Sequence, residues 1–166
     1  MKSVTSMGAA ITHRGPDDEG AFVDQDQAVA LGHRRLAVLD LSPRGAQPMH
    51  CRSGRYVIAF NGEIYNHGEL RDALVAEPSA GAPGAWRGTS DTETVLAAFE
   101  QWGVEAALQR FRGMFAFALW DRERHELTLA RDRLGEKPLY YGWSGGAFVF
   151  GSELAALEAF PGFDRP

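Results

Sequence analysis

The sequence holds one cysteine, Cys51, among its 166 residues. A lone cysteine excludes an internal disulfide framework and a cysteine-rich zinc site, and we expect no bound metal. No apolar run approaches the roughly 20 residues of a membrane-spanning helix. The opening residues, Met1 to Gly8, lack the apolar segment of a secretory signal. These absences predict a soluble, cytoplasmic protein with no membrane partner.

An excess of basic residues is missing as well. The 17 Lys and Arg residues are outnumbered by 22 Asp and Glu residues, which gives a net charge of −5. Proteins that bind nucleic acids broadly need a basic footprint, so this balance argues against a nucleic-acid partner. What the chain does have is 45% hydrophobic residues, over a length that suits one domain with its own core.

The first half of the chain is predicted to mix strands and helices. Residues 28–41 are rich in Val, Leu and Ala without helical spacing, which indicates one or two strands. Residues 56–60 form an apolar strand that ends at an Asn-Gly pair, and a helix is expected over 67–75. Apolar spacing predicts a second helix over 90–103, and the Gly- and Pro-rich stretch 77–89 is expected to be a mobile loop.

The second half of the chain changes to short apolar strands, predicted at residues 115–120, 126–130, 138–141 and 147–150. Short connections between them force antiparallel neighbours. Several of these strands are apolar on both faces, which implies cover on both sides by another sheet and by helices. The predicted fold class is therefore α+β with stacked antiparallel sheets.

The pair Asn61-Gly62 follows a buried strand and allows two interpretations. Asn-Gly is a strong hairpin signal, which favours a simple turn. However, residues 63–67 make a poor partner strand. An Asn side chain beside a Gly backbone N–H would instead supply two donors to a developing oxyanion.

Two arginines stand inside an apolar run, in the sequence His33-Arg34-Arg35. Charged groups there cost free energy unless they are paired or face a ligand. One interpretation is an edge strand with solvated arginines. The other is a guanidinium fork presented to a carboxylate, for which Arg is better suited than Lys.

The segment Ser90-Asp91-Thr92-Glu93 has the pattern of a helix capping box. Ser90 would be the N-cap and Glu93 its partner, whereas Asp91 is not needed for the box. A carboxylate that faces a pocket from this position would bind an ammonium group. For two other candidates we favour a structural role: residues 130–138 are interpreted as a charged connecting loop, and Cys51 as an ordinary thiol in a turn.

Taken in order, the motifs of the chain resemble a known family. The blocks that carry the resemblance are His13-Arg14-Gly15-Pro16-Asp17-Asp18, Gly32-His33-Arg34-Arg35-Leu36, Asp40-Leu41-Ser42, Gln47-Pro48-Met49, Asn61-Gly62-Glu63-Ile64-Tyr65-Asn66, Ser90-Asp91-Thr92-Glu93, Arg112-Gly113-Met114-Phe115-Ala116-Phe117, Ala130-Arg131-Asp132, Lys137-Pro138-Leu139-Tyr140-Tyr141 and Ser152-Glu153-Leu154. The series closely resembles the glutaminase domain of glutamine-dependent asparagine synthetases, a class II glutamine amidotransferase. It runs from about His13 to Leu157, nearly the whole chain.

The resemblance implies an N-terminal-nucleophile hydrolase fold, a four-layer sandwich of two antiparallel sheets flanked by helices. It also implies hydrolysis of glutamine to glutamate, with ammonia passed to an ATP-dependent synthetase domain. By the motif match, Arg35 would hold the α-carboxylate of glutamine. Glu63 and Asp91 would bind its α-ammonium, and the Asn61 side chain with the Gly62 N–H would form the oxyanion hole.

Members of this family begin Met-Cys-Gly, and the cysteine becomes the first residue and the nucleophile once Met is removed. No such Cys-Gly strand stands in this sequence, and Cys51 has no free α-amine that would act as base. We therefore expect the chain as given to be inactive by itself. The alternative is a non-catalytic binding or scaffolding domain that kept the fold and lost the nucleophile.

The expected organisation is a glutaminase-like domain at residues 1–160, incomplete at its N-terminus, with a tail at 161–166 towards a missing synthetase domain. No cofactor is expected in this domain, because ATP and Mg would belong to the synthetase domain of the same or a partner chain. An absent core strand would expose a sheet edge and apolar surface, so a homodimer is a further expectation.

Overall fold

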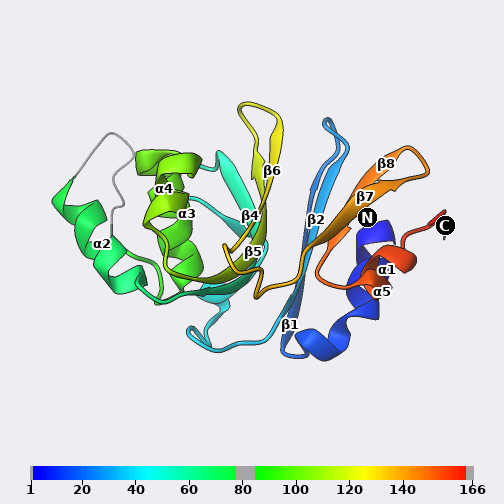
Figure 1. Ribbon diagram of the computed structural model, residues 1–166, viewed down its shortest axis with the longest axis horizontal. Helices are drawn as coiled ribbons and strands as arrows, with labels where there is room; N and C mark the ends of the chain where they lie inside the picture. The colour runs from blue at the N-terminus through cyan, green and yellow to red at the C-terminus, as the bar shows by residue number, and fades with distance from the viewer. Residues whose placement is uncertain (1, 78–84, 164–166) are drawn as a thin grey trace.

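Two layers of antiparallel strands lie between two layers of helices (Figure 1). The computed structural model describes residues 2–77 and 85–163. One outer layer holds helices α2 (His67–Ala76), α3 (Asp91–Trp102) and α4 (Val104–Arg110). The other holds α1 (Lys2–Ala10) and α5 (Leu154–Glu158). This arrangement confirms the predicted α+β sandwich of stacked antiparallel sheets.

The larger sheet has the strand order β3-β4-β5-β6. Its strands are β3 (Met49–His50), β4 (Tyr56–Ile64), β5 (Gly113–Asp121) and β6 (Glu126–Arg131). β5 is buried on both faces from Phe115 onward, as its continuous apolar run predicts. One face packs against aromatic side chains such as Phe99 of α3, and the other packs against Leu31 of the second layer.

The second strand layer consists of two hairpins. These are β1 (Asp18–Asp24) with β2 (Val29–Arg35), and β7 (Tyr140–Ser144) with β8 (Ala147–Gly151). Helices α1 and α5 cover this layer, and Met7 and Ile11 pack near Val149 and Leu157. Glu153 accepts a hydrogen bond from Arg14 at 2.9 Å, so the two ends of the described chain lie side by side.

Helix α3 begins as the capping signal predicts, with one difference in the partners. Ser90 accepts the N–H of Thr92 through its hydroxyl at 3.2 Å, and Gly103 with φ of +80° follows the helix. Glu93 does not complete the box with Ser90. Its carboxylate accepts the N–H groups of Arg87 (2.9 Å) and Gly88 (3.0 Å), so it orders the segment before the helix instead.

The pair Asn61-Gly62 neither forms a hairpin turn nor ends its strand. β4 continues to Ile64, and Gly62 stands opposite Phe115 of β5. A Cβ at Gly62 would lie 2.6 Å from the Cα of Phe115, so the missing side chain lets the two strands approach closely here. Of the predicted mobile loop 77–89, residues 78–84 lie outside the described residues. No helix in the described part of the chain is long and apolar enough to cross a membrane.

Candidate functional site

One cavity of about 600 Å³ collects the five residues that the family resemblance assigns to glutamine. It lies within the sandwich and is lined from α1, β2, β4, β5, β8 and the start of α3. The five are Arg35, Asn61, Gly62, Glu63 and Asp91. This volume suits a small organic ligand. Residues that are 56 positions apart in the chain therefore face one space, which no local pattern could establish.

Asn61 and Glu63 come to the cavity by the alternation of strand β4. Phe60 and Ile64 of this strand pack into the core beneath the helices, whereas Ala59 packs toward the second strand layer. Side chains alternate along a strand, so Asn61 and Glu63 share the face of Ala59. Within the described part of the chain, the Asn61 side chain makes no hydrogen bond. Its amide N–H groups are free to serve a ligand.

The N–H of Gly62 also points away from the neighbouring strand β5. Phe115, which stands opposite Gly62, accepts the N–H of Asp132 at 2.7 Å and donates its own N–H to the Asp132 carboxylate at 3.2 Å. Phe115 therefore has no hydrogen-bonding group left for Gly62. In an antiparallel ladder this makes the two residues a pair without mutual hydrogen bonds, and the Gly62 N–H faces the other edge of β4.

That other edge of β4 carries a row of N–H groups. Phe60 donates its N–H to the side-chain oxygen of Gln47 at 2.6 Å. Ile64 donates its N–H to the carboxylate of Asp91 at 2.8 Å. The N–H of Gly62 lies between these two bonds and faces the same edge. The backbone thus presents a donor close to the Asn61 amide, as an oxyanion site needs.

Arg35 ends strand β2 and is held by the loop that follows it. Its guanidinium donates to the main-chain oxygens of Asp40 and of Ser42, the latter at 3.2 Å. A guanidinium has five N–H groups, so these two bonds leave three for a ligand. A Cβ at Gly45 would lie 3.0 Å from the Arg35 Cζ, so the absence of a side chain there leaves room for the guanidinium.

Arg34, the neighbour of Arg35, has a structural role. It donates to the oxygen of Gly15 at 3.2 Å and forms an ion pair with Glu19. Its side chain is 12% exposed, so the interpretation of solvated arginines on an edge strand is wrong for this residue. Both arginines line the cavity, but the guanidinium of Arg34 is paired with Glu19, whereas that of Arg35 donates to main-chain oxygens.

Asp91 is the first residue of helix α3 and is 5% exposed. Burial raises the pKa of its carboxyl, although the N–H groups of Ile64 and Thr92 oppose that rise. The nearby charge of Glu63 raises the pKa further. A buried carboxylate whose charge is disfavoured gains from an incoming cation. Asp91 and Glu63 together therefore suit an ammonium group.

Two residues of the cavity wall were missed as candidates. The side-chain amide of Gln47 bonds to Phe60 as the backbone of a neighbouring strand would. Its oxygen accepts the N–H of Phe60, and its nitrogen donates to the main-chain oxygen of Phe60 at 3.0 Å. His33 Nε2 also lies 3.0 Å from the Phe60 oxygen, and burial lowers the pKa of this histidine to about 4. Both roles depend on the approach of distant segments, and no spacing signals them.

Cys51 lies outside the cavity, whereas Lys137 and Pro138, at the end of the predicted connecting loop 130–138, contribute to its wall. Cys51 is buried, its sulfur accepts the N–H of Tyr56 at 3.0 Å, and burial raises its pKa. Asp132 organises the loop after β6 by accepting four backbone N–H groups. Within residues 2–77 and 85–163, no three His, Cys, Asp or Glu side chains are placed to hold a metal ion.

Comparison with curated proteins finds relatives across nearly the whole chain. It is 40% identical over 162 residues to asparagine synthetase [glutamine-hydrolyzing] 3 of Bacillus subtilis, covering 96% of this chain and 25% of that protein. It is 38% identical over 150 residues to amidase chry2 of Gibberella zeae, covering 90% of this chain and 21% of that protein. The chain thus spans a quarter or less of the length of these two relatives.

A solved structure shares the fold. Glutamine phosphoribosylpyrophosphate amidotransferase from B. subtilis superposes with a TM-score of 0.78 at 21% identity, covering 96% of this chain and 41% of that one. This likeness confirms the predicted N-terminal-nucleophile hydrolase-like sandwich. The family model described as "Glutamine amidotransferase domain" matches residues 1–166. The match covers the whole chain, and the sandwich fold and the cavity agree with it. The chain therefore belongs to the glutamine amidotransferase domain family.

Proposed function

We propose that the cavity binds L-glutamine and that the domain releases the glutamine amide as ammonia for a synthetase portion of the same or a partner chain. One observation carries the proposal. A cation, Arg35, and a buried carboxylate, Asp91, line the same cavity as two free donors, Asn61 and Gly62. An α-amino acid with a side-chain carbonyl needs all of these groups.

Three charged residues would account for recognition of the α-amino acid. The guanidinium of Arg35 would donate to the α-carboxylate, and a hydrogen bond of this charged kind contributes roughly 1.5–3 kcal/mol. Asp91 and Glu63 would accept from the α-ammonium. That cation would also relieve the unfavourable burial that raises the Asp91 pKa. The side-chain amide of glutamine is then left to face strand β4.

The two donors of β4 account for stabilisation of the transition state. When a nucleophile attacks the amide carbon, negative charge develops on the carbonyl oxygen. The Asn61 side chain and the Gly62 N–H would donate to this oxyanion. Removing one donor of this kind typically costs about 2.7–4 kcal/mol of transition-state stabilisation.

The nucleophile would be a cysteine thiol on a strand next to β2 and β8. Both strands line the cavity, and among residues 2–77 and 85–163 each pairs with a strand on one edge alone, β2 with β1 and β8 with β7. A strand seated there would bond to these open edges, and the family's N-terminal Cys-Gly strand suits the place. Its sulfur would bond to the amide carbon and its α-amine would take the thiol proton and pass it to the leaving nitrogen, which departs as ammonia. Water then cleaves the thioester to give glutamate.

The partner of this domain would be a synthetase portion, because the asparagine synthetase relative is about four times as long as the stretch that the chain matches. Such a portion would consume the ammonia with ATP and Mg. The division into residues 1–160 and a tail at 161–166, the homodimer and the cytoplasmic location remain predictions.

The experiment compares three forms of the chain: the 166-residue form, one extended at its start by the family's Met-Cys-Gly strand, and the same extension with Ser for Cys. We expect L-glutamine to bind to all three and ammonia to be released by the Cys form alone. Asn61→Ala in the Cys form should lower kcat by about 100-fold or more. Binding without ammonia release from the Cys form would favour the non-catalytic domain, and absence of glutamine binding would contradict the proposal.

A further inference from the structure

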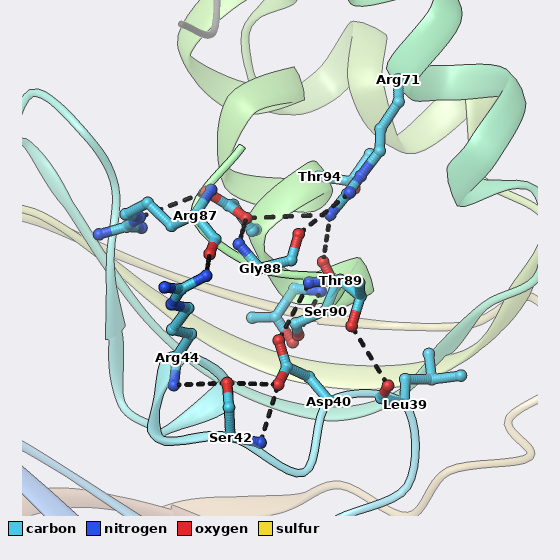
Figure 2. A network of polar contacts seen from close by, with 12 residues as sticks. Leu39, Asp40, Ser42, Arg44, Arg71, Arg87, Gly88, Thr89, Ser90 and Thr94 are labelled. Atoms are coloured by element: carbon cyan, nitrogen blue, oxygen red, sulfur yellow. Dashed lines mark hydrogen bonds and ion pairs between the residues drawn. The ribbon is translucent and has the colours of Figure 1, made fainter. Parts of the chain in front are cut away.

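A single buried carboxylate joins two segments that carry proposed glutamine-binding residues (Figure 2). Asp40 lies in the loop after β2 and is 8% exposed. Its Oδ1 accepts the N–H of Ser42 at 2.9 Å and the hydroxyl of Ser42 at 2.6 Å. Its Oδ2 accepts the N–H of Thr89, just before helix α3, at 3.0 Å. The Thr89 hydroxyl donates back to the oxygen of Leu39 at 3.3 Å.

On one side, this bridge determines where Arg35 lies. The guanidinium of Arg35 donates to the main-chain oxygens of Asp40 and Ser42, which belong to the loop that the Asp40 carboxylate folds. The side chain of Asp40 therefore shapes the loop, and the main chain of the same loop holds the arginine. A loop released from Thr89 would take its two acceptors, and Arg35 with them, away from α3.

On the other side, the bridge determines where helix α3 begins. Thr89 precedes the N-cap Ser90, which is followed by Asp91. Arg71 of helix α2 supports this segment, because it donates to the oxygens of Gly88 (3.2 Å) and Ser90 (2.9 Å). The segment before α3 is therefore held from both sides, by Arg71 and by Asp40 (Figure 2).

Gly88 shows how closely the two segments fit together. A Cβ at this position would overlap the Oδ2 of Asp40 and lie 3.2 Å from the Cβ of Arg44. Arg44 adds a second bond between the segments, because it donates to the oxygen of Arg87 at 2.6 Å. The contact between the loop and the segment before α3 thus depends on a residue without a side chain.

We propose that Asp40 is a positioning residue that sets the separation between Arg35 and Asp91. The inference rests on the proposed function, since these two residues would bind the α-carboxylate and the α-ammonium of glutamine. A ligand gains from both ion pairs at once only if their spacing is fixed before it binds. The Asp40 bridge thereby selects ligands that carry both charged groups on one carbon, without touching the ligand itself.

The test measures calorimetric binding of three ligands to the chain. They are L-glutamine, 4-carbamoylbutanoate, which lacks the α-ammonium, and 4-aminobutanamide, which lacks the α-carboxylate. Asp40→Asn replaces one carboxylate oxygen by an NH2 group, which cannot accept a hydrogen bond. That group would face the donors of either Ser42 or Thr89, so the bridge should open on that side. We expect L-glutamine to bind about tenfold more weakly to this variant, and the truncated ligands less than about threefold more weakly.

Two further variants accompany Asp40→Asn. Gly88→Ala keeps the Asp40 charge and displaces its carboxylate, so it should produce the same selective loss even if Asp40→Asn folds poorly. Asp26→Asn removes the same charge from an exposed turn and should leave all three affinities unchanged.

The outcomes separate this inference from the proposed function. A wild-type chain that binds none of the ligands overturns both. If the wild type prefers L-glutamine and both bridge variants keep that preference, Asp40 does not position the two residues. Equal weakening of all three ligands in folded variants would assign Asp40 a general structural role and would also overturn the inference.

Discussion

The carboxylate of Asp91 accepts the N–H of Ile64 at 2.8 Å and so joins the first residue of helix α3 to the last residue of strand β4. Both residues are buried. The bond satisfies an N–H that would otherwise be buried without a partner, and it holds Asp91 against the strand that carries Asn61 and Gly62. One carboxylate therefore has a structural role and a proposed ligand-binding role, which substitutions can separate.

Asp91→Asn and Asp91→Ala are expected to differ. Asn keeps an oxygen for the Ile64 N–H, so the variant should fold with little loss of stability and bind L-glutamine at least about tenfold more weakly. Ala leaves the Ile64 N–H unsatisfied and should also lower the free energy of unfolding by about 1–3 kcal/mol. Urea unfolding and calorimetric binding measure the two effects. Equal stability of the two variants would contradict the structural role of Asp91.

Gly62→Ala is expected to destabilise the sheet. The added Cβ would lie 2.6 Å from the Cα and 2.8 Å from the Cβ of Phe115, so β4 and β5 must move apart. Overpacking of this kind costs about 1–3 kcal/mol in the free energy of unfolding. The matched control is Gly68→Ala in helix α2, where a Cβ meets nothing within 4 Å and should stabilise by about 0.5–1 kcal/mol. Thermal or urea unfolding gives both values.

His33 is expected to make stability depend on pH in the mildly acidic range. Burial and the charge of Arg35 lower its pKa from 6.5 to about 4 in the folded chain. Between these two values the unfolded chain binds the proton and the folded chain does not, so stability falls as the pH falls. The slope from this residue approaches about 1.4 kcal/mol per pH unit.

His33→Gln keeps a donor for the Phe60 oxygen and has no titrating ring. The free energy of unfolding, measured by urea at several pH values from 4 to 7, should therefore depend less steeply on pH in this variant. His125→Gln, which removes a histidine from the exposed turn between β5 and β6, is the matched control. A slope that is the same in His33→Gln and in the wild type would refute this account of His33.

Asp132 is expected to contribute stability that is lost at lower pH. Burial alone would raise its pKa, but the N–H groups of Lys137, Glu136, Phe115 and Leu134 outweigh burial and lower the pKa from 3.8 to about 2. The folded chain thus holds this carboxylate charged where the unfolded chain protonates it. The contribution is complete above about pH 4 and disappears as the pH falls towards 2.

Asp132→Asn places an amide NH2 against two of these N–H donors. It should lower the free energy of unfolding at pH 7 by about 1.5–3 kcal/mol and reduce the loss of stability between pH 4 and pH 2. Urea unfolding across this range measures both, with Asp26→Asn as the control for removing one charge. Wild-type stability of Asp132→Asn at pH 7 would show that the loop does not depend on this carboxylate.

Local patterns predicted the elements whose signals lie within a few neighbouring residues. The apolar spacing of α3 with its N-cap Ser90, and the continuous apolar run of β5, each depend on periodicity and capping alone. The strand predicted at residues 56–60 ended too early, because Asn61-Gly62 is a turn signal in isolation, whereas β4 runs to Ile64. It continues as a strand because Gly62 packs against Phe115, a contact between residues 53 positions apart.

By itself, the sequence determined the α+β class, the separate candidate residues and, through the ordered motifs, the family resemblance. Periodicity, turn chemistry and residue type are local properties, so they can be recognised in the sequence without knowledge of the fold. Only the tertiary structure decided that Arg35 is held by the oxygens of Asp40 and Ser42, and that the Asp40 carboxylate reaches Thr89 across 49 positions. Such contacts depend on how the loop after β2 packs against the start of α3, and no local pattern encodes that distance.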